Sequence, residues 1–264
     1  MLNYFQQEKL KSNSIHTLYI NVRYQEFNNK KNESIMSPKD QELYKFLQQF
    51  TTEERKKRFE EVLNYRTRHV TIVLEDIYQS HNASAVLRSC DINGIQDIHV
   101  IENRWVYNVN PDIVVGSVKW LDLKKYNEND FNTPEAFDNL HKKGYKIVAT
   151  CPHQDDFTPD ELPLDEPVAI VFGTEKTGLS QYALENADMY VKIPMFGFTE
   201  SYNISVSAAL MMYTLMQRLH NSNIDWHLTE EEKDELRLDW SKKSIRRFWD
   251  FEQKFRDMHP EFYK

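Results

Sequence analysis

Asn82 and Arg88 stand six residues apart in the segment HNASAVLRSCDINGI, and both side chains could act on a phosphate or a hydroxyl group. An arginine side chain stays charged, so it can bind a phosphate or stabilise a developing negative charge. Taken alone, the segment is more typical of a helix that Asn82 caps and in which Arg88 pairs with an acid such as Asp91. The segment by itself leaves both interpretations open.

A glycine-bracketed loop is the second candidate. In VFGTEKTGLS, Gly173 and Gly178 flank Glu175 directly after an apolar run, so backbone N–H groups could face a ligand there. The loop nearly matches the phosphate-binding pattern G-x-x-x-x-G-K-[ST], but Leu179 stands where the lysine is required. It therefore does not predict a nucleoside triphosphate site, and alone it is more typical of a structural turn.

The third candidate segment, KIPMFGFTESYNISVSAAL, places Gly197, Ser201 and Asn203 before a run of small residues. Asn203 is well placed to cap the helix that follows. The small side chains would let another backbone approach that helix closely; they are Ser205, Ser207, Ala208 and Ala209. Ordinary capping and packing would also explain this segment.

An alternation of strands and helices positions the three segments. The strand VTIVLE at 70–75 precedes a helix at 82–93 that Gly94 ends, and the strand DIHVIE follows at 97–102. A strand–helix–strand unit of this kind pairs its strands in parallel. Because ligands of a parallel sheet bind at the carboxyl ends of its strands, the polar segments lie where a site is expected.

The pattern continues through the second half of the domain. Thr133 is predicted to cap a helix that has Pro134 in its first turn and that Gly144 ends. Further strands are predicted at 145–150, 167–173 and 189–194, and a long helix at 203–219. The sequence thus predicts an α/β domain, with a parallel sheet and helices on both of its faces.

Flanking segments are expected on both sides of this domain, which spans 70–224. Residues 1–35 are rich in Asn, Lys, Gln and Ser and predict a weakly ordered extension. Residues 36–69 predict a helical N-terminal arm whose apolar stripe consists of Phe46, Leu47, Phe59, Val62 and Leu63. Residues 225–264 predict a helical C-terminal extension. It begins with a capping box of Thr229 and Glu232, and its apolar stripe consists of Leu236, Trp240, Ile245, Phe248, Trp249 and Phe255.

The charge balance restricts where RNA could bind. With 33 Lys and Arg against 41 Asp and Glu, the net charge is −8. Phosphate contacts dominate RNA affinity, so any RNA surface must be a local basic patch. Two runs could form it or could simply be solvated helix faces. They are Arg55, Lys56, Lys57 and Arg58 before the domain, and Lys242, Lys243, Arg246 and Arg247 near the C-terminus.

Membrane, disulfide and metal sites are not expected. No stretch approaches the roughly 20 apolar residues of a spanning helix, and the first residues lack the apolar centre of a secretory signal. We therefore expect a soluble protein of the cytoplasm. Cys90 and Cys151 are the only cysteines, they show no metal-binding spacing, and a cytosolic setting would keep both reduced.

In this order and with these spacings, the three segments resemble the signature motifs of the SpoU/TrmH family of RNA 2′-O-methyltransferases. The patterns N-x-x-x-x-x-R, F-G-x-E-x-x-G-L-S and I-P-M-x-G-x-x-x-S-x-N-x-S-V-S-A-A all keep their key residues. The resemblance runs from about Lys56 to about Phe251. The segments KKRFEEVLNYRTRHVTIVLED and EEKDELRLDW also look like the extensions of the tRNA guanosine-18 2′-O-methyltransferase branch.

The resemblance implies an enzyme that uses S-adenosylmethionine, without a metal, to methylate a ribose 2′-hydroxyl in tRNA, with guanosine 18 of the D-loop the expected target. It implies a trefoil knot in the C-terminal half of the domain. It also implies a homodimer, for which the small residues of the helix at 203–219 could form the seam. The implied cofactor pocket is built from three loops that contain Thr150, Gly173, Ile193, Ser201 and Ile204.

Arg88 matches the catalytic arginine of the family. Because a guanidinium is almost never deprotonated, we expect Arg88 to bind the adjacent phosphate or to stabilise the developing alkoxide, not to act as a base. Asn82 would orient Arg88 or the ribose. Glu175 and Asn203 match the other polar positions and would fix the loops and the substrate.

Two alternatives share this fold: a ribosomal-RNA 2′-O-methyltransferase of the same family and a non-catalytic RNA-binding paralogue. Terminal arms in place of a compact N-terminal RNA-binding domain favour tRNA. The polar set argues for an enzyme, since Asn82, Arg88, Glu175 and Asn203 are all present. A dinucleotide-dependent oxidoreductase is excluded, because no G-x-G-x-x-G turn follows the first strand.

Overall fold

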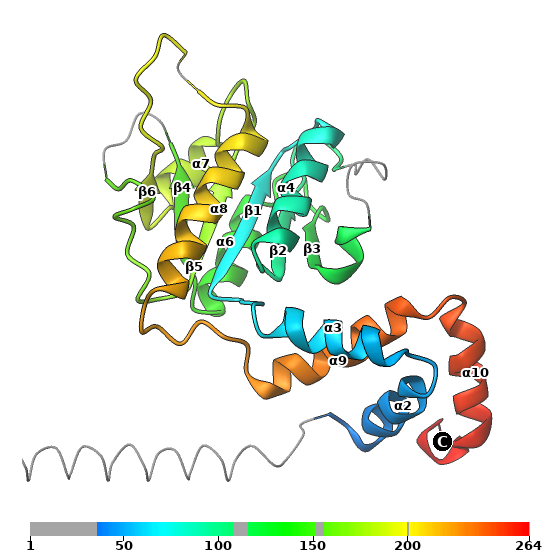
Figure 1. Ribbon diagram of the computed structural model, residues 1–264. Coiled ribbons are helices and arrows are strands. Elements are labelled where there is room, and N and C mark those ends of the chain that lie inside the picture. The colour runs from blue at the N-terminus through cyan, green and yellow to red at the C-terminus, as the bar shows by residue number, and fades with distance from the viewer. Residues whose placement is uncertain (1–35, 108–115, 152–155, 200, 264) are drawn as a thin grey trace, which may run out of the picture.

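A six-stranded parallel sheet forms the centre of the protein (Figure 1). The computed structural model describes residues 36–107, 116–151, 156–199 and 201–263, and the extension expected at 1–35 lies outside them. The strands lie in the order β3-β2-β1-β5-β4-β6. Their bounds are β1 Val70–Glu75, β2 Asp97–Ile101, β3 Asp122–Tyr126, β4 Lys146–Thr150, β5 Val168–Phe172 and β6 Met189–Val191.

Helices cover both faces of the sheet, as the sequence predicts. Along β1, Ile72 and Leu74 pack against the helices of one face and Val73 against those of the other, because neighbouring strand residues point to opposite faces. On the first face lie α4 (Ser80–Ile92) and α8 (Ile204–His220), and on the second α6 (Thr133–Lys142) and the short α7 (Gln181–Glu185). The parallel α/β architecture is thereby confirmed.

Strand β3 is an element that the sequence analysis did not predict. Its sequence, DLKKY, buries Tyr126 fully and leaves Lys124 and Lys125 exposed. The strand pairs with β2 at the edge of the sheet, after the 3₁₀ turn η1 (Ser117–Trp120). Lysines are common on edge strands, where they discourage pairing with a further chain. Such a strand lacks the β-branched run that identified its neighbours.

Two of the predicted helix caps are wrong. Asn82 is the third residue of α4, and the cap position belongs to Gln79, whose side chain makes no capping hydrogen bond. Thr133 is the first residue of α6, and Asn132 precedes it at the cap position. The hydroxyl of Thr133 donates to the buried carboxylate of Glu75 at 2.5 Å instead. Both residues are therefore used to join elements, not to cap their own helices.

Gly94 ends α4 as predicted, with φ of 78°. A Cβ atom at this position would lie 2.1 Å from the carbonyl oxygen of Tyr65. The chain that leads into β1 thus passes directly against the end of α4. The position needs glycine both for its left-handed backbone and for this close approach.

The N- and C-terminal extensions pack against each other, beside the amino ends of the strands (Figure 1). Their helices are α2 (Pro38–Gln48), α3 (Glu53–Leu63), α9 (Glu230–Ser244) and α10 (Phe248–Met258), followed by η2 (Pro260–Tyr263). One apolar cluster joins α2 to α9 and α10 through Leu43, Phe46, Leu47, Leu238 and Phe255. A second joins α3 to α9 through Phe59, Leu63, Leu228, Leu236 and Trp240.

Details of the C-terminal extension match the sequence in part. The predicted capping box is present, because Thr229 N–H donates to Glu232 at 2.9 Å and Glu232 N–H donates to the Thr229 hydroxyl at 3.2 Å. Trp249, however, is not part of the apolar stripe, since it is 66% exposed. Among the described helices, none has the length and apolar character needed to cross a bilayer.

Candidate active site

Residues from all three polar segments meet at the carboxyl ends of the strands. We call this side of the sheet the carboxyl edge. Oε1 of Glu175 accepts hydrogen bonds from Nδ2 of Asn82 at 2.8 Å and from Nδ2 of Asn203 at 2.6 Å. The Nδ2 of Asn203 also donates to Oδ1 of Asn82 at 3.2 Å. We call these three residues the amide–carboxylate cluster. The fold thus brings together side chains that lie up to 121 residues apart in the sequence.

Each asparagine of the cluster is held by its own helix. Asn82 is buried in the first turn of α4, where its Nδ2 also donates to Gln79 at 2.7 Å. Asn203 caps α8 as predicted, because its Oδ1 accepts from the backbone N–H of Ser205 at 2.9 Å. Its oxygen therefore serves the helix while its nitrogen reaches Glu175. This division fixes the orientation of the amide.

The glycines around Glu175 are needed by the loop itself. Thr174 and Gly178 exchange backbone hydrogen bonds of 3.0 and 2.9 Å, which folds the loop into a tight turn. A Cβ on Gly173 would lie 2.3 Å from the carbonyl carbon of Gly178, and Gly178 has φ of 67°. The turn therefore places Glu175 in a tight, hydrogen-bonded loop that depends on both glycines.

A cavity of about 410 Å³ adjoins the cluster, and we call it the carboxyl-edge cavity. It lies among the loops that follow β4, β5 and β6, and Leu179, Ile193 and Met195 give it apolar walls. Small-molecule sites commonly have volumes of about 300–1,000 Å³ and mostly apolar walls. The five positions expected to bind a cofactor all line it: Thr150, Gly173, Ile193, Ser201 and Ile204.

Arg88 lies apart from the cluster. Its side chain is exposed on α4, and within the described part of the chain no hydrogen bond or ion pair holds it. The ion pair with Asp91 considered above is wrong, because Asp91 pairs with the buried Arg66. Six residues separate Arg88 from Asn82, about 9 Å along the helix axis. Within one chain, the structure therefore joins Asn82, Glu175 and Asn203 but not Arg88.

Two polar residues at this end of the strands, the partly buried Gln79 and the buried Glu75, were missed by the sequence analysis. Gln79 accepts from Asn82 and donates to the hydroxyl of Tyr78 at 3.2 Å. Glu75, 1% exposed, accepts from the backbone N–H and the hydroxyl of Ser180, both at 2.8 Å. An acidic residue at the end of an otherwise apolar strand was the available signal for Glu75.

The two basic runs lie on the extensions, and half of their charges form ion pairs. On α3, Lys56 pairs with Glu53 at 2.7 Å and Arg58 pairs with Glu61 at 3.3 Å. Near the end of α9, Lys243 pairs with Asp239 and Arg247 with Asp250. In the described residues no carboxylate pairs with the other four, which are Arg55, Lys57, Lys242 and Arg246.

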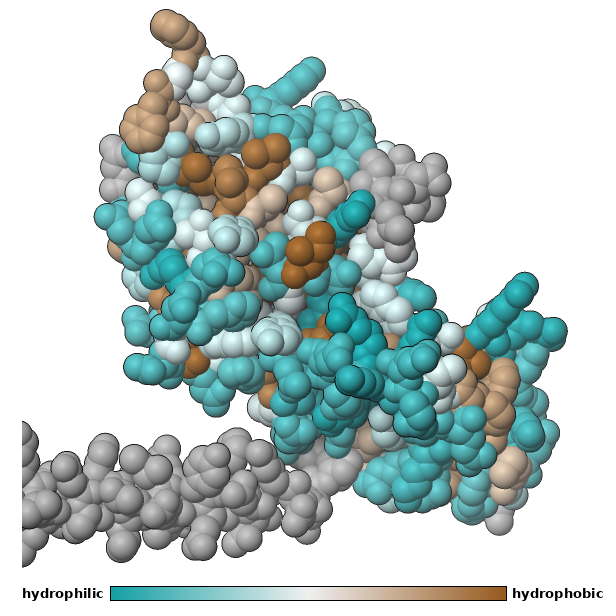
Figure 2. Space-filling model, viewed as in Figure 1, coloured by the Kyte–Doolittle hydropathy of each residue, from teal (hydrophilic) through white to brown (hydrophobic). Residues whose placement is uncertain are grey.

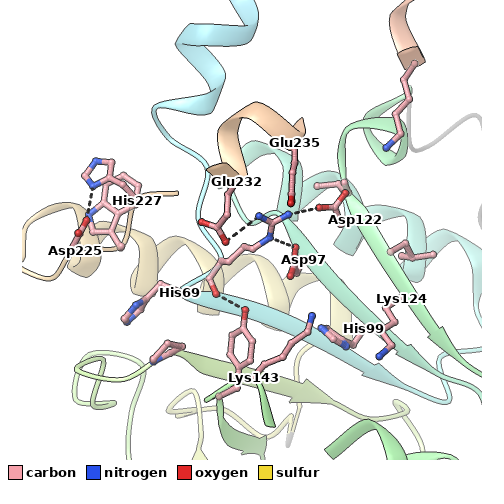
Figure 3. Close-up of a pocket in the computed structure, with 17 residues that line it drawn as sticks. His69, Asp97, His99, Asp122, Lys124, Lys143, Asp225, His227, Glu232 and Glu235 are labelled. Atoms are coloured by element: carbon pink, nitrogen blue, oxygen red, sulfur yellow. Dashed lines mark hydrogen bonds and ion pairs between the residues drawn. The ribbon is translucent and has the colours of Figure 1, made fainter. Parts of the chain in front are cut away.

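A larger cavity, about 970 Å³, lies at the opposite ends of the strands, between their amino ends and α9 (Figure 3). We call this side of the sheet the amino edge. Asp97, Asp122 and Glu232 converge there on one guanidinium, that of Arg68, at 3.0, 2.8 and 3.1 Å. Burial would lower the pKa of Arg68, but these carboxylates outweigh it and raise the pKa. Arg68 is thus fully engaged in linking the sheet to the C-terminal extension.

His99 also lines this larger cavity. Its Nδ1 lies 2.8 Å from the hydroxyl of Tyr126. Burial, together with Lys143 and Lys124, lowers the pKa of His99 to about 3, so the ring is neutral at physiological pH. Among the residues that the structure describes, no group of three His, Cys, Asp or Glu side chains could hold a metal ion.

Comparison with known proteins gives a consistent result. The model of the SpoU rRNA Methylase family matches residues 69–213. A tRNA (guanosine(18)-2′-O)-methyltransferase of Borreliella burgdorferi is 48% identical over 202 residues, which cover 76% of this chain and 91% of the relative. The enzyme of the same name from Thermus thermophilus is 35% identical, over 73% of this chain and 98% of the relative.

Solved structures agree with the sequence comparison. The TrmH/SpoU tRNA modifying enzyme of Aquifex aeolicus has a TM-score of 0.65 and 27% identity, covering 74% of this chain and 98% of that one. The SpoU methyltransferase AviRb of Streptomyces viridochromogenes has a TM-score of 0.52 and 20% identity, covering 61% and 64% of the two chains. The second likeness concerns the fold alone.

Proposed function

The chain belongs to the SpoU rRNA Methylase family, and on that premise we propose that it methylates a ribose 2′-hydroxyl of tRNA, at guanosine 18 of the D-loop. The observation that carries this proposal is the amide–carboxylate cluster. Asn82, Glu175 and Asn203 come from three distant segments and meet beside a cavity of suitable size. The similarity to guanosine-18 enzymes over about three quarters of the chain supports tRNA as the substrate.

The carboxyl-edge cavity is the proposed site of S-adenosylmethionine. Its apolar walls at Leu179, Ile193 and Ile204 suit an adenine ring, and the backbone of the surrounding loops offers hydrogen-bonding groups. S-adenosylmethionine would supply an electrophilic methyl group whose leaving group is built in, so no metal is needed. Thr150 lines this cavity, and its hydroxyl donates to the carbonyl of Val171 at 2.8 Å.

Each residue of the cluster has a proposed role. Glu175 holds the two asparagines together, so that the loop after β5 and the first turns of α4 and α8 keep one relative position. Asn82 and Asn203 are positioning residues that would orient the ribose. Arg88 would bind the adjacent phosphate or stabilise the alkoxide that develops as the 2′-hydroxyl loses its proton.

No described contact joins Arg88 to the amide–carboxylate cluster within one chain. In a homodimer with a shared site, Arg88 of one subunit would lie next to the cluster of the other. Figure 2 shows apolar atoms gathered over α8. Val206, Leu210 and Tyr213 lie on one stripe of that helix and are 44%, 42% and 60% exposed. Ala208, one of the small residues expected at the seam, is buried within the same chain. The exposed stripe is therefore the better candidate seam.

The finer features of the fold remain part of this proposal. We expect a trefoil knot in the C-terminal half of the methyltransferase domain, which spans 70–224, with a helical arm at 36–69 and a helical extension at 225–264. Loops following β4, β5 and β6 line one cavity, as a knotted pocket would require. A role in tRNA modification would place the protein in the cytoplasm.

The substrate is tested by mapping ribose methylation in RNA from cells with and without the gene. We expect loss of methylation at guanosine 18 of tRNA. Loss at a ribosomal-RNA site would favour the alternative within the family, and an unchanged map would favour the non-catalytic paralogue. Calorimetry should detect S-adenosylmethionine binding, and binding that disappears with a chelator would contradict the metal-free site.

The shared site is tested with mixed dimers. Arg88→Ala and Asn203→Ala subunits, each inactive as a homodimer, should recover part of the activity when they are exchanged into heterodimers. Exchange is verified independently with differently tagged subunits. No recovery in verified heterodimers would contradict the shared site, and so would a monomeric mass of the wild-type protein in solution.

A further inference from the structure

A second cavity at the carboxyl edge, about 270 Å³, adjoins the proposed cofactor site. The two cavities share residues of the loop after β5, namely Thr174, Thr177, Gly178 and Leu179. The other walls of the second cavity come from the ends of β1 and β2 and from the segment before α6. Whatever binds there lies beside the group in the neighbouring cavity.

Exposed aromatic rings border this second cavity. Trp105 and Phe131 line it and are 53% and 44% exposed. The ring of Tyr78, 39% exposed, lies 5.6 Å from that of Trp105. Tyr78 is linked to Asn82 through Gln79. Since a folded protein gains little from exposing large rings in one place, their gathering indicates a surface that binds a flat apolar partner.

Two opposite charges at this cavity are available to a ligand. Arg104 and Asp130 both line it and are exposed. Neither has an ion pair or a side-chain hydrogen bond to any residue that the structure describes. A guanidinium can bind a phosphate, and a free carboxylate accepts N–H groups. The cavity therefore offers stacking, an anion contact and a hydrogen-bond acceptor together.

Hydrogen bonds hold the backbone of the wall that carries Arg104 and Trp105. Asp76 has a left-handed backbone with φ of 58°, which is unusual for a residue other than glycine. Its Oδ1 accepts the backbone N–H groups of Asn103 and Arg104, both at 2.8 Å. The neighbouring Glu75 is bound to Ser180 and Thr133. Strained backbone held by such networks is concentrated at functional sites.

We propose that this second cavity binds a nucleobase of the substrate RNA, turned out of its stack and placed between Trp105 and Phe131. The inference rests on the proposed function and extends it, because it assigns a binding site to the base of the nucleotide whose ribose is methylated. Stacking on aromatic rings accepts an extruded base of any type. Asp130 adds a preference for guanine, whose N1–H and N2–H groups face one way and match a carboxylate.

Stacking is tested by substitutions at Trp105. Trp105→Leu keeps an apolar side chain but no ring, and it should lower kcat/KM for a tRNA transcript by about tenfold or more, mainly through KM. Trp105→Phe should retain most of the activity. Trp249→Leu, which makes the same change at another exposed tryptophan, is the control. Equal rates for the leucine and phenylalanine variants would overturn the stacking role.

The base preference is tested with a tRNA transcript that carries inosine at the target position. Inosine lacks the N2 amino group, so the wild-type protein should methylate it more slowly than guanosine, and Asp130→Asn should reduce this difference. A preference that Asp130→Asn leaves unchanged would remove Asp130 from recognition.

A binding measurement separates this inference from the proposed function. In a Trp249→Phe background, tRNA should quench tryptophan fluorescence, and Trp105→Phe should remove most of the quenching; Trp120, which is partly exposed beside Arg55, accounts for any remainder. If the wild-type protein methylates tRNA but shows no quenching that depends on Trp105, the cavity does not bind the base. If it methylates no tRNA, the proposed function fails, and the quenching still decides whether Trp105 contacts RNA.

Discussion

Charged side chains are paired at the amino ends of the strands and largely unpaired at the carboxyl ends, within the described residues. At the amino edge, three carboxylates surround Arg68 and connect β2, β3 and α9. At the carboxyl edge, Glu175 is bound by two neutral amides, and Arg88 and Arg104 have no partner in the described residues. Paired charges hold elements together, whereas an unpaired arginine remains available to a phosphate. We therefore predict that substitutions at the carboxyl edge mainly lower activity and that substitutions at the amino edge mainly lower stability.

Arg88→Ala should give the largest effect and would establish the carboxyl edge as the reactive one. Loss of one group that stabilises developing charge typically lowers the rate by about 10²–10³-fold. Arg88→Lys should recover little, because lysine keeps the charge but not the planar fork. Single-turnover methylation of a tRNA transcript at saturating cofactor measures both.

Cofactor affinity and thermal stability of the Arg88 variants should match the wild type, because Arg88 lies outside the carboxyl-edge cavity. A rate for Arg88→Ala close to that of the wild type would exclude Arg88 from the chemistry.

Arg68→Met should show the opposite pattern. Removing the guanidinium leaves three carboxylates facing one another in a partly buried site, where Arg68 is 22% exposed. We expect the free energy of unfolding to fall by about 2–3 kcal/mol, somewhat less than for a fully buried pair. The methylation rate of the folded protein should change little. Urea denaturation measures the loss.

The control for Arg68 is Lys45→Met, which removes an exposed ion pair to Glu42 of 2.7 Å. Such pairs contribute at most about 1 kcal/mol. Equal stability losses in the two variants would contradict a special role for the amino edge.

His99 should make stability depend on pH. Its pKa is about 3 in the folded protein and 6.5 in the unfolded chain, so between these values the unfolded chain binds a proton that the folded protein does not. Stability contributed by the neutral ring is therefore complete above pH 6.5 and falls as the pH drops towards 3. Denaturation of the wild type and of His99→Gln at several pH values measures this.

When the pH falls from neutral to about 5, the free energy of unfolding should decrease by about 2 kcal/mol less in His99→Gln than in the wild type. Parallel pH curves for the two proteins would show that His99 does not titrate in this way.

The smallest effect is expected for substitutions on the N- and C-terminal extensions. An effect on tRNA binding there would show that the amino side of the protein also contributes to function. Glutamine at the four cations without ion pairs, Arg55, Lys57, Lys242 and Arg246, should weaken tRNA binding severalfold. Each lost phosphate contact should flatten the salt dependence by about 0.9 in the logarithmic slope. Filter binding at several salt concentrations measures both.

Glutamine at the ion-paired cations, Lys56, Arg58, Lys243 and Arg247, is the matched control and should affect tRNA binding less. If neither set changes tRNA affinity, the amino edge and its extensions are purely structural.

Local sequence patterns predicted most of the fold and part of the site. The β-branched runs and the glycines at 94 and 144 marked elements because those features act over a few residues. Strand β3 was missed because its partners, not its own composition, make it a strand. Asn82 was misplaced as a cap because its partner Glu175 lies 93 residues away, and no local pattern identifies such a contact.

The contact at Gly94 makes the residue type at this position depend on the presence of the N-terminal arm. Its missing side chain is what lets the carbonyl of Tyr65 pass the end of α4 on the way into β1. A lineage that kept the arm could not accept any larger residue there without rerouting the chain into the sheet. We therefore expect relatives with this arm to retain glycine at the position, and relatives that enter the first strand from another direction to be free of this constraint.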